Sequence, residues 1–352
     1  MSYKSRLLWA VSAAALAVIG ANPAFAAGTA AGSTITNTVT VNFQVGGVVQ
    51  TATGASNTFT VDRKVNVTVA EVGTATTQVS PGQTAAVTTF SVTNNSNATL
   101  DFALLAAQQS GGAGAHANTD SFDATNVRIY VDTNSNGSYD AGTDTLVTYL
   151  DELAADASKT VFIVADVPLS LTTGAVAAVT LTATGKEGGA ASSQGATLTE
   201  TAGANTAAMD TVFADAAGAT DALRDAAHSV KDDYTVLAAA LTVTKTSTVI
   251  SDPFNGITSP KAIPGATLEY CIIVSNAAGS ATAGTVDISD PLPGTVTYSS
   301  AYGIFVDGTA TSGVCNTDGN AGGSFSSGTV NGTLTSVAAA QTKTLRFRAT
   351  IN

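Results

Sequence analysis

Alternating apolar and polar side chains constrain the fold of this 352-residue chain more than any other feature. Between residues 35 and 45 the apolar side chains all stand at odd positions, and the even positions hold Thr, Asn or Gln. A period of two predicts a strand with one buried face. Gly46-Gly47 then predicts a tight hairpin turn into Val48-Val49, and residues 57–62 a further short strand.

Two longer units open in the same way. Each has a strand, a Pro-Gly turn and an alternating strand that ends at Asn: 65–69, Pro81-Gly82 and 90–94 in the first, and 241–245, Pro264-Gly265 and 270–276 in the second. Proline presets the turn and glycine supplies its positive φ. We therefore predict an all-β fold, with tandem immunoglobulin-like β-sandwich domains behind an N-terminal β-hairpin.

The second unit resembles the DUF11 repeat domains of bacterial surface proteins. The resemblance covers residues 241–352 and rests on Val243-Thr244-Lys245, Pro264-Gly265, Tyr270, Val274-Ser275-Asn276, Ala283, Val286, Asp290-Pro291-Leu292-Pro293 and Thr344-Leu345-Arg346-Phe347. It implies an immunoglobulin-like fold and a structural or adhesive role, and it carries no catalytic residues across. The central unit resembles the same family only through its opening strands.

The first 26 residues indicate export. Lys4 and Arg6 precede the apolar run 7–20, and Ala24-Phe25-Ala26 fits a signal-peptidase cleavage site. The alternative is a retained membrane anchor, but the run is shorter than the about 20 apolar residues that a spanning helix needs. No later segment predicts a transmembrane helix in the mature chain.

The remaining sequence divides into four parts. Residues 27–62 form the hairpin segment, 63–200 the central sandwich and 237–352 the C-terminal sandwich. Residues 201–236 are rich in Ala and Asp and predict a linker or an insertion in the central sandwich, with one short helix over 219–230. A second cation site in this segment is the alternative, because it holds many aspartates.

The charge balance excludes some partners. The formal net charge is −12, which opposes binding to nucleic acid or to anionic membranes. Acidic side chains can instead serve as cation ligands.

The only two cysteines, Cys271 and Cys315, predict one disulfide in an oxidising compartment. It would close a loop of about 45 residues, which is worth on the order of 3–4 kcal/mol in the loop-entropy model.

One loop carries the oxygen pattern of a calcium site. Residues 132–144 place oxygen side chains at alternating positions around Gly137, in the order of an EF-hand-type loop. The predicted ligands are Asp132, Asn134, Asn136, Ser138 through its backbone carbonyl, Asp140, and Asp144 in place of the acid expected one residue earlier. A hard cation needs about six to eight oxygens, which this spacing gathers.

Two interpretations of this loop stay open. Predicted strands flank it, so it resembles the calcium loops of adhesin β-sandwich modules and not a helix-loop-helix sensor. The alternative is an Asx-rich hairpin turn without metal, because Asn-Gly is a strong turn former by itself.

No catalytic motif is found in the sequence, so we do not expect an enzyme. The two histidines, His116 and His228, lie far apart, and the Gly-rich surroundings of His116 predict a flexible surface turn. Paired acids such as Asp151-Glu152 could suggest a glycosidase, but the only tryptophan is Trp9 in the signal segment.

Two function classes follow. The first is a secreted structural or adhesive protein of a bacterial cell surface or extracellular matrix, which associates with itself or with other surface proteins. Its strand 34–45 could complete the sheet of a neighbouring subunit and so build a filament, or it could pair within its own hairpin. The second class is a soluble extracellular module that binds a ligand such as a surface polysaccharide.

Overall fold

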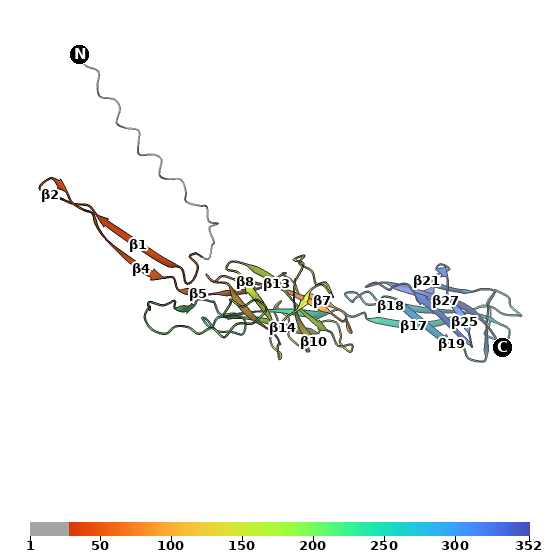
Figure 1. The fold of residues 1–352 in the computed structure, drawn as a ribbon. Coiled ribbons are helices and arrows are strands. Elements are labelled where there is room, and N and C mark those ends of the chain that lie inside the picture. Colours follow the sequence, from red (N-terminus) through yellow and green to blue (C-terminus); the bar gives the residue numbers. More distant parts are fainter. Residues whose placement is uncertain (1–27) are drawn as a thin grey trace, which may run out of the picture.

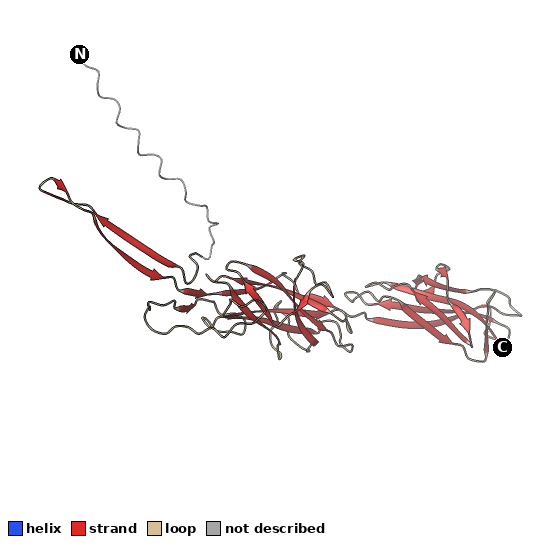
Figure 2. Ribbon diagram, viewed as in Figure 1, coloured by secondary structure: helices blue, strands red, loops and turns tan. Residues whose placement is uncertain are grey.

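The computed structural model describes residues 28–352, so the predicted signal peptide 1–26 lies outside the described residues. An N-terminal β-hairpin, a central β-sandwich and a C-terminal β-sandwich follow one another in Figure 1, with the hairpin at one end and the C-terminus at the other. Figure 2 shows strands and loops throughout the described chain, and none of the described residues forms a helix long and apolar enough to cross a membrane. The predicted all-β fold is confirmed.

The hairpin is a two-stranded antiparallel ribbon. One arm consists of β1 (Thr34–Val41) and β2 (Gln44–Val45), and the other consists of β3 (Val48–Val49) and β4 (Thr53–Thr60). Val45 pairs with Val48 across Gly46-Gly47, and Ile35 pairs with Phe59 near the base. The predicted hairpin is confirmed, and the strand 34–45 pairs within it. The predicted buried face is wrong, because every residue of β1 is exposed.

The central sandwich packs two antiparallel sheets face to face. The first sheet has the order β11 (Thr145–Leu146), β10 (Thr125–Val131), β13 (Ser158–Asp166), β8 (Ala86–Asn94) and β6 (Val67–Glu71). The second has the order β12 (Tyr149–Leu153), β9 (Leu100–Gln108), β14 (Val176–Lys186), β16 (Ala227–Val236) and, in parallel, β7 (Thr77–Val79). A short parallel pair joins β5 (Arg63–Val65) to β15 (Thr211–Phe213).

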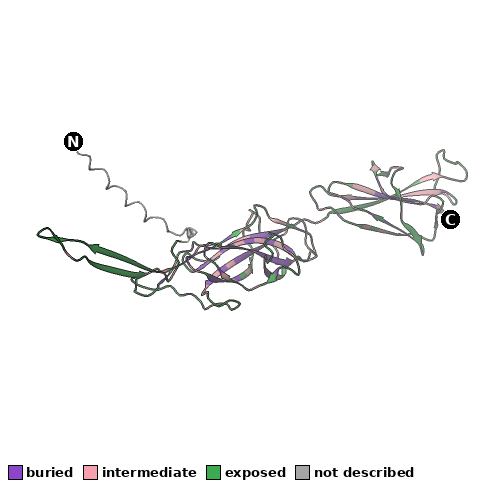
Figure 3. Ribbon diagram, turned by 45° about the horizontal axis from the view of Figure 1, so that its top comes forward, coloured by how far each residue is buried: buried purple, intermediate pink, exposed green. Residues whose placement is uncertain are grey.

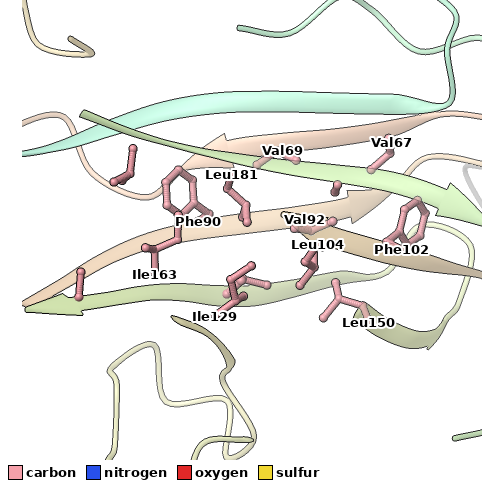
Figure 4. Packing of buried hydrophobic residues seen from close by; sticks show 14 of the residues in the cluster. Val67, Val69, Phe90, Val92, Phe102, Leu104, Ile129, Leu150, Ile163 and Leu181 are labelled. Atoms are coloured by element: carbon pink, nitrogen blue, oxygen red, sulfur yellow. The ribbon is translucent and has the colours of Figure 1, made fainter. Parts of the chain in front are cut away.

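Alternation builds the core between these sheets. Every second side chain of β8 is buried, and Phe90 and Val92 meet Phe102 and Leu181 from the facing sheet (Figure 4). Large side chains that are fully removed from water give this sandwich most of its stability.

Of the two alternatives for segment 201–236, a linker or an insertion in the central sandwich, the linker is wrong, and the predicted helix is absent because the segment contributes strands to the central domain. Its last ten residues form β16, which pairs with β14 inside the second sheet and buries Tyr234 in the core. The central sandwich therefore ends near residue 236 and not at 200. The sequence obscured this strand because Asp232 stands among the core-facing Val230, Tyr234 and Val236, and the adjacent Asp233 is buried on the other face.

The C-terminal sandwich has one large and one small sheet. The large sheet has the order β17 (Leu241–Ser251), β18 (Thr267–Asn276), β27 (Thr342–Ile351), β21 (Ile304–Gly308) and β24 (Asn320–Ala321), and β20 (Val296–Tyr298) also pairs with β27. The small sheet has the order β19 (Val286–Pro291), β26 (Thr329–Leu334) and β25 (Ser324–Ser326). A short pair, β22 (Ala310–Thr311) and β23 (Val314–Cys315), brings Cys315 to Cys271, and the predicted disulfide between them is present.

A buried asparagine marks equivalent positions in the two sandwiches. Asn94 ends β8 and donates to the carbonyls of Ala98 and Leu153. Asn276 ends β18 and donates in the same way to the carbonyls of Ala281 and Val337. The side chain ties the strand end to the facing sheet in both cases, so the repeat predicted from sequence is also a repeat in structure.

Candidate functional site

The exposed hairpin has one apolar and one polar face. The apolar side chains stand at odd positions of β1, where Asn37 interrupts them, and continue to the turn, with exposures of 57% at Val39, 49% at Val41, 46% at Phe43 and 62% at Val45. Phe59 extends the apolar face from β4 beside Ile35. Threonines line the other face, where the hydroxyls of Thr36 and Thr58 lie 3.1 Å apart. Figure 3 shows the whole ribbon as exposed.

The hairpin also has two free strand edges and no charge. β1 pairs only with β4 among the described strands, and residues 28–61 contain no Asp, Glu, Lys or Arg. Proteins ordinarily protect exposed edge strands with charged side chains, proline or bulges, since unpaired backbone groups are a template for another chain. An uncharged ribbon with one largely apolar face and free edges therefore has the properties of a binding surface for another β-structure.

The predicted calcium loop gathers its acids around backbone amides. Asp132 follows β10 and is 2% exposed, and its two carboxylate oxygens accept the amides of Asn136 at 3.2 Å and Gly137 at 2.8 Å. Asp144 is 7% exposed and accepts the amides of Thr133 at 3.0 Å and Asp140 at 2.7 Å. Asp144, which stands one residue after the expected ligand position, thus points into the loop and joins its two ends.

Two asparagine side chains of the loop lie beside its third acid, Asp140. Asn134 and Asn136 both donate to Oδ2 of Asp140, at 3.0 and 2.6 Å, and these bonds lower the pKa of Asp140. Rotating either amide by half a turn would present its oxygen at the same place, beside the carboxylate. Ser138 is exposed and donates its amide to Asn136 Oδ1. Hydrogen bonds link the predicted ligand residues within the loop, and calcium binding there stays a prediction.

A second cluster joins three segments that are distant in sequence. His116 Nε2 lies 3.1 Å from Glu71 Oε1 on β6, and its Nδ1 lies 3.2 Å from Asp233 and 3.9 Å from Asp232, both on β16. Asp233 also accepts the amides of Ala115 and His116, which fixes the loop on the sheet. His116, which we expected on a flexible surface turn, is instead held by acidic side chains at both ring nitrogens.

The surroundings of this cluster shift the pKa values of His116, Asp232 and Asp233. Burial alone would lower the pKa of His116, but the hydrogen bond to Asp233 and the charges of Glu71 and both aspartates raise it. Burial raises the pKa of Asp232 to about 7. Burial would also raise the pKa of Asp233, but hydrogen bonds, including that of His116, lower it. The group can serve as a buried ion-pair network or as a nitrogen and oxygen ligand set for a divalent metal.

A third cluster fixes a long loop of the central sandwich. Asp101 is fully buried and accepts the amides of Glu152 and Gly195, while Asp151 accepts the amide of Ser192. Ligand atoms of Asp101, Asp151 and Glu152 lie within 4.8 Å of one another, as do those of Glu71, His116 and Asp232. Sequence analysis missed both groups, because only the adjacent acids Asp151-Glu152 and Asp232-Asp233 signal them locally.

Comparison with known proteins gives distant structural likenesses only. No family model matches the sequence, and no curated protein matches it. Among solved structures, the class 5 fimbriae chaperone CfaA aligns over 78% of this chain and 83% of its own, at 8% identity and a TM-score of 0.24. The CupB6 tip adhesin from Pseudomonas aeruginosa aligns over 81% and 89%, at 12% identity and a TM-score of 0.24. The collagen adhesin from S. aureus aligns over 83% and 84%, at 12% identity and a TM-score of 0.21. The function therefore has to be argued from the chain's own geometry.

Proposed function

We propose that this chain is an exported structural or adhesive subunit of a bacterial cell surface or extracellular matrix, and that it associates with copies of itself. The observation that carries the proposal is the N-terminal hairpin, which presents an uncharged apolar face and two free edges to solvent. The described part of the chain leaves this surface exposed, and a second copy of the chain can cover it.

The rest of the molecule supports a scaffold role. Two sandwiches related by an internal repeat, a disulfide and loops fixed by buried carboxylates favour rigidity. The DUF11-like residues of the C-terminal sandwich favour the same class, and we propose no catalytic activity for the chain.

Self-association through the hairpin is tested by changing the charge of one face. In Val39→Lys, a charge replaces an apolar side chain in the middle of the apolar face. Thr38→Lys is the matched control, because it puts the same charge on the threonine face next door. We expect large assemblies of the mature protein in sedimentation and electron microscopy, loss of them in Val39→Lys, and retention in Thr38→Lys. A wild-type protein that stays monomeric at high concentration would contradict the proposal.

We further propose that the loop 132–144 binds calcium and thereby stiffens the central sandwich. Two of the loop's carboxylates accept backbone amides of the loop and the third accepts two asparagine side chains, and a hard cation prefers such oxygens as ligands. Binding to the folded state alone raises the unfolding temperature in proportion to the logarithm of the calcium concentration.

The calcium proposal predicts a melting temperature that falls when chelator is added and recovers with calcium. Asp140→Asn should remove that dependence, whereas Asp287→Asn, an exposed aspartate of the C-terminal sandwich, should keep it. An unchanged melting temperature in chelator, with no calcium found in the purified protein, would rule the site out.

A further inference from the structure

The C-terminal sandwich repeats part of the central one with fewer described strands in its second sheet. The large sheet of each runs from a first strand through the strand that ends in the buried asparagine: β6 and β8 in the central sandwich, β17 and β18 in the C-terminal one. The register agrees, since Val67 pairs with Asn94 and Leu241 pairs with Asn276. Val67 and Val69 therefore correspond to Leu241 and Val243.

The second sheets differ at one edge. In the central sandwich, β9 follows β8 along the chain, pairs with β12 on one side and with β14 on the other, and β16 continues the sheet beyond β14. In the C-terminal sandwich, β19 follows β18 and pairs with β26, but no described strand pairs with its other edge. No described strand of this sandwich corresponds to β14 or β16.

The missing strands leave apolar side chains uncovered. In the central sandwich β14 and β16 lie over β6, where Val67 is 0% and Val69 is 1% exposed. The equivalent Leu241 is 39% and Val243 is 66% exposed. The same inward-facing positions of the same strand thus change from buried to exposed because two strands are absent.

A buried polar atom marks the same place. Asp290 on β19 forms an ion pair with Lys245 of β17 through Oδ1, at 2.6 Å. Its other oxygen, Oδ2, is buried and has no hydrogen-bond partner in the described part of the chain. A buried carboxylate oxygen without a donor is costly, so this atom is available as an acceptor for a group that the described strands do not supply.

The hairpin has the form of the missing pair. It consists of two antiparallel strands of 8 residues each, as β14 and β16 are an antiparallel pair of 11 and 10 residues. Its apolar face can cover Leu241 and Val243, and its threonine face can stay in water. Since the hairpin carries no charge, it adds no unpaired charge beside the Lys245–Asp290 pair.

We infer that the hairpin of one copy completes the C-terminal sandwich of the next. One hairpin strand pairs with the free edge of β19, and the other lies over β17. This inference rests on the proposed self-association and identifies the acceptor. The hairpin and the C-terminal sandwich lie at opposite ends of the chain in Figure 1, so donor and acceptor belong to different copies. A head-to-tail contact between different surfaces can add one copy after another, and it gives a filament where the rotation between copies does not close a ring.

The inference is tested by complementation between two defective chains. Deletion of residues 28–61 removes the donor, and Val243→Asp places a charge on the acceptor. Each variant alone should be monomeric, and their equimolar mixture should give dimers that grow no further, because only one donor and one acceptor remain functional. Thr242→Asp is the matched control on the outer face of β17 and should assemble like the wild type.

The outcomes separate the inference from the broader proposal. If the deletion abolishes assembly but Val243→Asp still forms filaments, or if the mixture gives no dimer, the hairpin binds elsewhere and the acceptor is wrong. If the deletion variant still forms filaments, both the proposal and the inference fail. Circular dichroism and melting curves establish that each variant is folded.

A cysteine pair gives an independent readout. Val39→Cys and Val243→Cys, made in separate chains and mixed, should form a disulfide-linked heterodimer. Thr38→Cys should not link to Val243→Cys, because its side chain lies on the threonine face. Equal linking by both hairpin variants would overturn the predicted orientation of the hairpin in the acceptor.

Discussion

Strands β1 and β8 have similar alternating sequences but differ in burial: every second residue of β8 is buried, and all of β1 is exposed. Both alternate β-branched or aromatic side chains with polar ones. Phe90 of β8 is fully removed from water, whereas Phe59, the hairpin neighbour of β1, is 52% exposed.

The difference lies in what covers each strand. β8 is paired on both sides and faces a second sheet, whereas β1 is paired on one side and faces no other element. Alternation therefore specifies that a strand has an apolar face, and it does not specify which chain buries that face. The C-terminal sandwich stands between these cases, because its β17 is only partly covered.

The largest effect is expected in the fully covered strand. Phe90→Ala removes a ring that is buried on all sides and should lower the free energy of unfolding of the central sandwich by about 3–5 kcal/mol. Urea denaturation of the mature protein measures it. A loss below about 1 kcal/mol would mean that the core closes around the gap, and the contrast with β1 would weaken.

The partly covered sandwich should depend on its disulfide. Replacing Cys271 and Cys315 together by serine should lower the unfolding free energy of the C-terminal sandwich by about 2–5 kcal/mol. Calorimetry can follow its transition beside that of the central sandwich, which should not move. An equal shift of both transitions would show that the two sandwiches unfold as one unit.

A smaller effect concerns the far end of β17. Asp252 accepts the amides of Phe254, Asn255 and Lys261, and these bonds, that of Asn255 foremost, hold its pKa well below the ordinary value. A lowered pKa means stability that is present above the unfolded-state pKa, near 4, and is lost as the pH falls below it. Asp252→Asn should therefore lower the melting temperature at pH 7 and lose its effect in strong acid. A difference that persists unchanged at the lowest pH would contradict this account.

The smallest effect on stability is expected in the hairpin. Phe59→Ala should change the unfolding free energy of the monomer by less than about 0.5 kcal/mol, because the ring already faces water. The same change should weaken assembly, which sedimentation at increasing concentration measures. A large loss of monomer stability would show that the hairpin folds back onto its own chain, and the comparison with β8 would break.

Local sequence patterns determined a good part of this protein. The alternating runs, the Pro-Gly turns and Gly46-Gly47 predicted strands and a hairpin that the structure contains, because backbone geometry and side-chain period are local properties. The cysteine pair predicted its bond, since no other partner exists. The spacing of residues 132–144 likewise predicted a tight loop around Gly137, whose amide donates to Asp132.

Only the tertiary structure decided what each strand is covered by. It placed β16 in the central sheet against its own polar pattern, because buried Asp232 and Asp233 are held by His116 and by loop amides from another segment. It also left Val243 exposed where Val69 is buried, because two strands of the second sheet have no counterpart. Burial depends on contacts between segments that are distant in sequence, and such contacts leave little signal in any one of them.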